Sequence, residues 1–197
     1  MNIRETNFKF SGVLSPRTGT NYIVLHHRAG DGDVNSIHSQ HLGQGYAGIG
    51  YHFYVRKDGS VYRGRPVNTI GAHCLNYNRV SVGVCFEGNF ENEQMSEVQL
   101  NAGIELVRYL KGLYPNASIV GHKDLMSTAC PGRNCPMEKI KGGVTVKKKL
   151  ESANDITWEL NNSHFPIEDT DGFVKALDKA KQENSPLYWG YYKLVNK

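Results

Sequence analysis

The sequence has no long run of apolar residues. A helix that crosses a membrane needs roughly 18 or more consecutive apolar residues, and no stretch of the 197 residues comes near that length. The charged first residues are not followed by an apolar run, so we expect no signal peptide. Gly-X-Y triplets, sustained heptads and a longer internal repeat are also missing. These absences exclude collagen, coiled coils and repeat arrays.

Cysteine is scarce, with four residues in the chain. Without a signal peptide, four cysteines do not indicate a disulfide framework, and free thiols or a metal ligand are the better interpretation. The net charge of +4 is uneven: residues 151–197 hold five Lys against eight Asp and Glu, so residues 1–150 are the basic part. A basic surface suits an anionic cell-wall polymer or is simply solvated. No nucleic-acid-binding motif accompanies it, so we expect no nucleic-acid partner.

The length suits one domain of about 150 residues with an extension of roughly 50. The composition changes at Lys141-Gly142-Gly143 and Lys147-Lys148-Lys149, which indicate a linker. We therefore predict a domain over residues 1–145 and a small helical C-terminal module over residues 146–197. The module is rich in aromatic residues, Trp158 and Trp189 among them. Two interpretations stay open for it: a helical mini-core docked on the first domain, or a module that binds wall polymer or a partner.

Strand and helix patterns alternate along the first domain, which predicts an α/β sheet layered with helices. The predicted strands are 21–27, 51–57, 60–65, 80–86 and 118–121, with a hairpin turn at Asp58-Gly59. One helix is predicted over 35–42, starting at Asn35 or Ser36. A second starts at Ser96, with Gln99 completing a capping box, and ends near Tyr114. Three short helical patterns follow in the module, at 155–160, 173–180 and 185–195.

Three residues have the chemistry of a zinc site. His26 ends a predicted strand, His122 follows another, and Cys130 comes eight residues after His122. Two imidazoles and one thiolate leave a fourth position for water, as a catalytic zinc requires. The alternative is a core histidine with an inert buried cysteine. Alternation along the strand turns His27 away from His26, and we expect His27, His38, His41 and His52 to be structural.

A series of short motifs resembles one family in order and spacing. The motifs are His26-His27, Gly50-Tyr51-His52-Phe53, Asp58 to Arg65, Gly71-Ala72-His73, Asn76-Tyr77-Asn78, Ser81 to Val84, Gly121-His122-Lys123-Asp124 and Thr128 to Gly132. Together they resemble the zinc-dependent N-acetylmuramoyl-L-alanine amidases, which share a fold with T7 lysozyme and the animal peptidoglycan recognition proteins. The resemblance covers roughly residues 18–140 and implies a mixed central sheet flanked by helices.

The resemblance also implies a reaction and its residues. The reaction is hydrolysis of the amide between N-acetylmuramic acid and L-alanine in bacterial peptidoglycan. The implied roles are zinc (Zn2+) ligands for His26, His122 and Cys130, catalytic groups for Tyr51 and Thr128, and substrate-groove residues for His73 and Asn78. Tyr51 would donate a hydrogen bond to the oxyanion, with Thr128 as a second donor.

Two rivals use the same fold without catalysis: a peptidoglycan-binding protein and a regulator that binds a protein partner. Loss of the cysteine ligand marks the non-catalytic members of the family, so Cys130 and Tyr51 favour an enzyme. With no signal peptide, we expect a phage endolysin or a bacterial autolysin. Such a protein would be made in the bacterial cytoplasm, act on the cell wall without inserting in the membrane, and leave the cell through a phage holin or a non-classical route.

Overall fold

The structure, a computed structural model, describes residues 1–145 and 170–183. The chain divides into two compact units, Met1–Thr145 and Val146–Lys197. In the second unit, α5 (Thr170–Gln182) covers the predicted helical pattern at 173–180. The patterns at 155–160 and 185–195, both tryptophans and the lysine run at 147–149 lie outside the described residues. Among the described residues, no helix is long and apolar enough to span a membrane.

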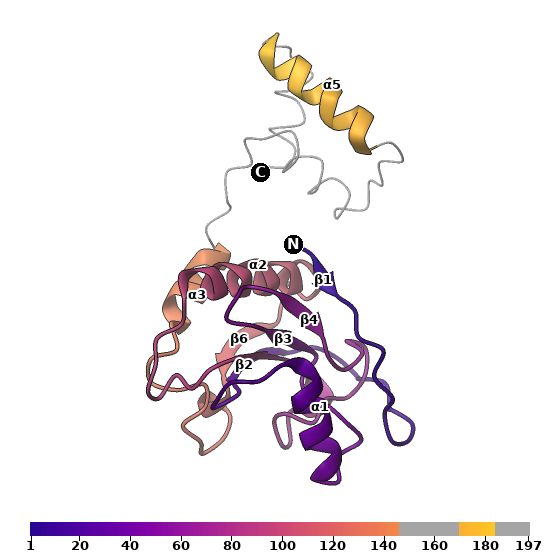
Figure 1. Cartoon of the computed structure of the whole chain (residues 1–197), viewed down its shortest axis with the longest axis vertical. Helices are drawn as coiled ribbons and strands as arrows, with labels where there is room; N and C mark the ends of the chain where they lie inside the picture. Colours follow the sequence, from indigo (N-terminus) through magenta and orange to yellow (C-terminus); the bar gives the residue numbers. More distant parts are fainter. Residues whose placement is uncertain (146–169, 184–197) are drawn as a thin grey trace. The chain divides into compact units, whose positions relative to one another are not determined.

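A six-stranded mixed sheet forms the centre of the first unit (Figure 1). In chain order the strands are β1 (Ile3–Arg4), β2 (Tyr22–His27), β3 (Phe53–Val55), β4 (Val61–Arg63), β5 (Ser81–Phe86) and β6 (Ser118–Gly121). They lie side by side as β1-β4-β3-β5-β2-β6. Strands β3, β5, β2 and β6 pair in parallel, β4 is antiparallel to β3, and β1 adds to β4 in parallel. The predicted mixed sheet is confirmed, and β1 is an addition to it.

The hairpin between β3 and β4 has the predicted turn. Gly59 adopts a φ of 81°, a left-handed conformation that glycine tolerates best. The carboxylate of Asp58 accepts hydrogen bonds from both the backbone N–H and the hydroxyl of Ser60. The paired strands are shorter than predicted, because pairing is confined to three residues on each side.

Helices cover both faces of the sheet (Figure 1). On one face, α2 (Glu97–Leu113) and α3 (Met137–Thr145) pack over a large core that includes Phe53, Phe86 and Leu106. On the other, α1 (Val34–Gly43) encloses a smaller core with Tyr54 and Cys85. Neighbouring residues of one strand, such as Cys85 and Phe86, thus belong to different cores, as strand alternation requires. The two faces give the predicted three-layer arrangement.

The helix starts differ in part from the prediction. Asp33, not Asn35 or Ser36, caps α1, because its Oδ1 accepts the backbone N–H of Ser36 at 2.7 Å. Ser96 caps α2 as predicted and accepts the N–H of Gln99 at 3.2 Å. The other half of the predicted capping box, in which the Gln99 side chain bonds back to the Ser96 backbone, is wrong.

The Gln99 amide reaches the sheet instead. Its Nε2 donates to the carbonyls of Val55 at 3.1 Å and Glu87 at 2.8 Å. Gln99 is buried, so these two carbonyls take the bonds that a solvated amide would give to water. The side chain therefore ties α2 to the ends of β3 and β5.

The predicted linker at Lys141-Gly142-Gly143 is also wrong, because α3 continues through these residues to Thr145. A Cβ at Gly143 would lie 2.8 Å from Ile104 of α2, so glycine allows the two helices to approach closely. The Gly143 carbonyl also accepts a 2.6 Å hydrogen bond from Arg108. Tertiary contacts of Gly143, which local composition does not reveal, offset the low helix propensity of glycine here.

Candidate metal centre

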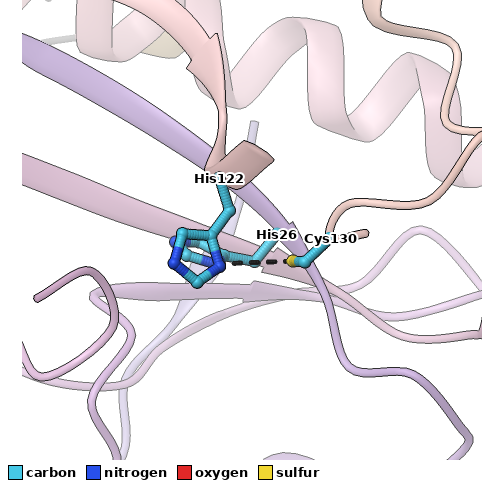
Figure 2. Close-up of side chains that lie close together, drawn as sticks. All are labelled: His26, His122 and Cys130. Carbon is cyan, nitrogen blue, oxygen red and sulfur yellow. Dashed lines mark hydrogen bonds between the residues drawn. The ribbon is translucent and has the colours of Figure 1, made fainter. Parts of the chain in front are cut away.

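His26, His122 and Cys130 converge at the carboxyl edge of the parallel strands (Figure 2). Strands β2 and β6 pair in parallel with Leu25 opposite Gly121. The next residues, His26 within β2 and His122 just after β6, therefore lie side by side. Cys130 comes from the loop that follows the 3₁₀ turn His122–Asp124. The carboxyl edge of a parallel sheet is the usual position of a ligand site in α/β proteins.

The spacing of the three side chains suits a metal ion. Their possible ligand atoms all lie within 4.8 Å of one another, and Cys130 Sγ is 3.6 Å from His26 Nδ1. Bond lengths of about 2.0–2.3 Å in a tetrahedral zinc site place ligand atoms roughly 3.3–3.8 Å apart. The Cys130–His26 pair already has this separation. The donor set of two imidazoles and one thiolate therefore fits zinc with one position left for water.

Hydrogen bonds within the loop hold Cys130 against the end of β6. The N–H of Lys123 donates to the Cys130 carbonyl at 2.7 Å, and the N–H of Gly121 donates to Asp124 Oδ2 at 2.8 Å. Thr128 is exposed, and its Oγ1 accepts the N–H of Cys130 at 3.3 Å. The structure thus places Thr128 at the solvent side of the cluster, two residues from the thiol.

Burial sets the protonation of the three groups. Burial, with His122 and His27 nearby, lowers the pKa of His26 well below its usual value, and burial also lowers the pKa of His122. Both imidazoles are therefore neutral, the form that binds metals. Burial raises the pKa of the Cys130 thiol to about 11. The thiol therefore loses its proton only when a cation compensates the thiolate, as coordination to a metal does.

Tyr51 lies beside the cluster. Its ring centroid is 5.2 Å from that of His26. Burial, then the Cys85 and Cys130 thiols, raise the pKa of Tyr51 well above its usual value. The phenol therefore keeps its proton and can serve as a hydrogen-bond donor.

The two predicted groove residues, His73 and Asn78, share one loop. Asn78 Oδ1 accepts the backbone N–H groups of His73 at 2.8 Å and Cys74 at 2.9 Å, which fixes the loop. The His73 ring turns to His26, with 3.0 Å between His73 Nδ1 and His26 Nε2. Burial, then neighbouring His26, His52 and His122, lower the pKa of His73 well below its usual value. Contact of His73 or Asn78 with a substrate stays a prediction.

The histidines expected to be structural all accept a backbone N–H through Nδ1. The pairs are Phe90 with His27 at 3.1 Å, Ile49 with His38 at 3.2 Å, Gly50 with His41 at 3.0 Å and Gly83 with His52 at 3.0 Å. A nitrogen that accepts such a bond has no free lone pair for a metal. His38 and His41, three residues apart on α1, therefore do not form a second metal site.

Two contacts at the site do not follow from the sequence. Cys85 lies opposite His26 in the β2–β5 register, within reach of Tyr51. The bond between His26 and His73 joins residues 47 apart in the chain. The pairing of β2 with β5 brings Cys85 to His26, and the loop between β4 and β5 brings His73 there. No local pattern encodes either contact.

Comparisons with known proteins agree with this geometry. Residues 16–133 match the family model of N-acetylmuramoyl-L-alanine amidases. The chain is 38% identical to the endolysin of Enterobacteria phage K11 over 106 residues, which cover 51% of this chain and 70% of the endolysin. It is 35% identical to peptidoglycan-recognition protein SC2 of Drosophila simulans over 126 residues, covering 57% of this chain and 68% of that protein.

A solved structure extends the match. The N-acetylmuramoyl-L-alanine amidase LysC from Clostridium intestinale URNW superposes with a TM-score of 0.72 at 40% identity, covering 75% of this chain and 99% of LysC. The similarity therefore includes the mixed sheet and the helices that flank it.

Proposed function

This chain belongs to the N-acetylmuramoyl-L-alanine amidase family, and from that premise we propose that it works with a zinc ion held by His26, His122 and Cys130. The enzyme hydrolyses the amide that joins N-acetylmuramic acid to L-alanine in peptidoglycan. The observation that carries the zinc proposal is the convergence of these three side chains at one sheet edge.

The residues around the cluster have distinct tasks in this proposal. A bound zinc ion lowers the pKa of water to about 7 and polarises the carbonyl of the amide. The protein supplies two neutral imidazoles and a thiolate, which hold the ion and leave one position open. Tyr51 donates its phenolic hydrogen bond to the oxyanion, supported by its place beside His26 and by a pKa that keeps it protonated. Thr128 offers a weaker, neutral donor from the solvent side.

We place the substrate along the loop of His73 and Asn78. Asn78 also lines a surface hollow with Ile70, Asn76 and Arg79. Asn78 connects this hollow to the backbone of His73. A hollow that opens to solvent suits a polymeric substrate, which must enter from outside. The partner is therefore the bacterial cell wall, and its peptidoglycan is the place of action.

The non-catalytic alternatives lack support at this site. A protein that only binds peptidoglycan needs no complete set of metal ligands. This chain holds all three donors within coordination range and has a protonated tyrosine beside them. These features favour catalysis over recognition alone.

The test combines metal content with product analysis. We expect one zinc per purified chain by mass spectrometry of the metal. Digested cell walls should gain L-alanine amino termini and no reducing sugar ends, and chelation should abolish this activity until zinc is restored. Cys130→Ala should lose the metal. The matched control Cys135→Ala, at another buried cysteine outside the ligand set, should keep it. Reducing ends as the sole product would contradict the amidase assignment.

A further inference from the structure

The two ring nitrogens of His26 face different partners. Nδ1 lies 3.6 Å from Cys130 Sγ, on the side of the proposed zinc ion. Nε2 lies 3.0 Å from Nδ1 of His73, away from the thiol. A neutral imidazole carries one proton on one nitrogen, so His26 can bind a metal through Nδ1 only if that proton sits on Nε2.

The contacts of Ser81 and His73 indicate where this proton sits. The Ser81 hydroxyl donates to the Tyr77 carbonyl at 2.8 Å, which uses its one hydrogen. Ser81 Oγ can then only accept from His73 Nε2, which lies 3.5 Å away. With its proton on Nε2, His73 presents a lone pair at Nδ1 and accepts from His26 Nε2. The lone pair of His26 is consequently left on Nδ1, the nitrogen that faces Cys130.

The surroundings hold the His73 ring in this position. A Cβ at Gly83 would lie 2.6 Å from the ring, and a Cβ at Gly71 would lie 2.5 Å from it, so both glycines make room for the imidazole. Asn78 fixes the backbone of His73 from the other side. The ring is therefore confined to a slot that only glycine at 71 and 83 leaves open.

We propose that His73 is a positioning residue, which selects the tautomer and the ring orientation of His26 in which Nδ1 is free for the metal. The inference rests on the proposed zinc site and deepens it. It gives His73 a task within the protein in place of the substrate contact expected from the sequence. Partners of this kind, behind a metal-binding histidine, typically change metal affinity about 10–100-fold when they are removed.

The experiment measures metal binding by the full chain, independently of turnover. Wild type, His73→Leu and His73→Asn compete for zinc with a chromophoric chelator, and their cobalt forms are compared by absorption spectroscopy. His73→Leu fills the slot without an acceptor, so its zinc affinity should fall about 10–100-fold and its cobalt spectrum should change. His73→Asn places an oxygen near the position of Nδ1 and should restore much of the affinity. His38→Asn, at a buried histidine outside the chain of bonds, is the matched control and should bind zinc as wild type does.

A second variant keeps the test decisive if His73→Leu does not fold. Ser81→Ala leaves both rings in place but removes the acceptor for His73 Nε2, so zinc affinity should fall by less than in His73→Leu. Unchanged zinc affinity in His73→Leu, or in Ser81→Ala where His73→Leu does not fold, would overturn the proposal. A raised KM for muropeptides in His73→Asn would then indicate a substrate contact instead. Failure of the wild-type chain to bind zinc would instead refute the proposed zinc site.

Discussion

The backbone N–H of Phe90 donates a 3.1 Å hydrogen bond to Nδ1 of His27, while the neighbouring His26 turns toward Cys130. The two histidines are adjacent in β2, and strand alternation sends their side chains to opposite faces of the sheet. The His27 ring holds the loop after β5, and the His26 ring belongs to the group of candidate metal ligands.

This division predicts opposite outcomes for two alanine variants. His26→Ala should lose both zinc and amidase activity, because it removes one of three ligands. His27→Ala should keep one zinc per chain but lose about 1–3 kcal/mol of unfolding free energy, because the N–H of Phe90 loses its acceptor. Metal analysis and thermal unfolding of both variants check this. Loss of zinc in His27→Ala together with its retention in His26→Ala would show that the faces are assigned the wrong way round.

Tyr51→Phe should fold and bind zinc but turn over slowly. Loss of one oxyanion donor typically costs about a hundredfold or more in kcat. Tyr54→Phe is the matched control, because the Tyr54 hydroxyl donates to the Gly32 carbonyl and takes no part in the cluster. Its kcat should stay at the wild-type value. Turnover by Tyr51→Phe equal to that of wild type would remove Tyr51 from the mechanism.

Periodicity predicted most of the strands and helices because each pattern reports whether a side chain faces a core. The helix caps and the ends of the helices were less predictable. Asp33 was missed because Asn35 and Ser36 have equally suitable side chains, and α3 was missed because its glycines are good linker residues in isolation. At the site, motif order gave the candidate ligands. The His26–His73 bond joins a strand to a loop residue 47 positions along the chain, a contact that no local pattern encodes.

Glu87 gives the protein a specific sensitivity to acid. Its carboxylate is buried, which by itself raises its pKa. Hydrogen bonds from the Arg56 side chain and from the backbone N–H groups of Lys57 and Gly32 outweigh burial and lower the pKa from 4.5. Because the folded-state pKa is depressed, this stabilisation is complete above the unfolded-state value and is lost as pH falls through the folded-state pKa.

Glu87→Gln should therefore lower the unfolding free energy by about 1.5–3 kcal/mol at neutral pH, the range for hydrogen bonds to a charged group. The difference from wild type should shrink as pH falls below about 4. Denaturant unfolding at a series of pH values measures it. The control Glu5→Gln breaks an ion pair in which Glu5 is 65% exposed, so it should cost less than about 1 kcal/mol. A Glu87→Gln penalty that is constant with pH would contradict the assignment.

Truncation after residue 145 tests the separate roles predicted for residues 1–145 and residues 146–197. All proposed site residues lie in the unit Met1–Thr145, so this fragment should fold, bind one zinc and cleave small soluble muropeptides. If residues 146–197 bind wall polymer, the fragment should act poorly on intact walls, because the local concentration of enzyme falls. If they dock as a structural unit, the fragment should be insoluble or thermally weak. A soluble fragment equally active on both substrates would contradict both roles.

The edge position of β6 has a consequence for the order of events during synthesis. Among the described strands β6 is the last in the chain, and it pairs only with β2, near the opposite end of the sequence. His122 and Cys130 follow it, so a growing chain carries His26 and Tyr51 long before it can present a complete set of ligands. The proposed metal site can therefore form only after the outermost strand has docked. A ribosome-bound chain that stops before residue 118 would contain most of the sheet strands but would lack two of the three proposed ligands.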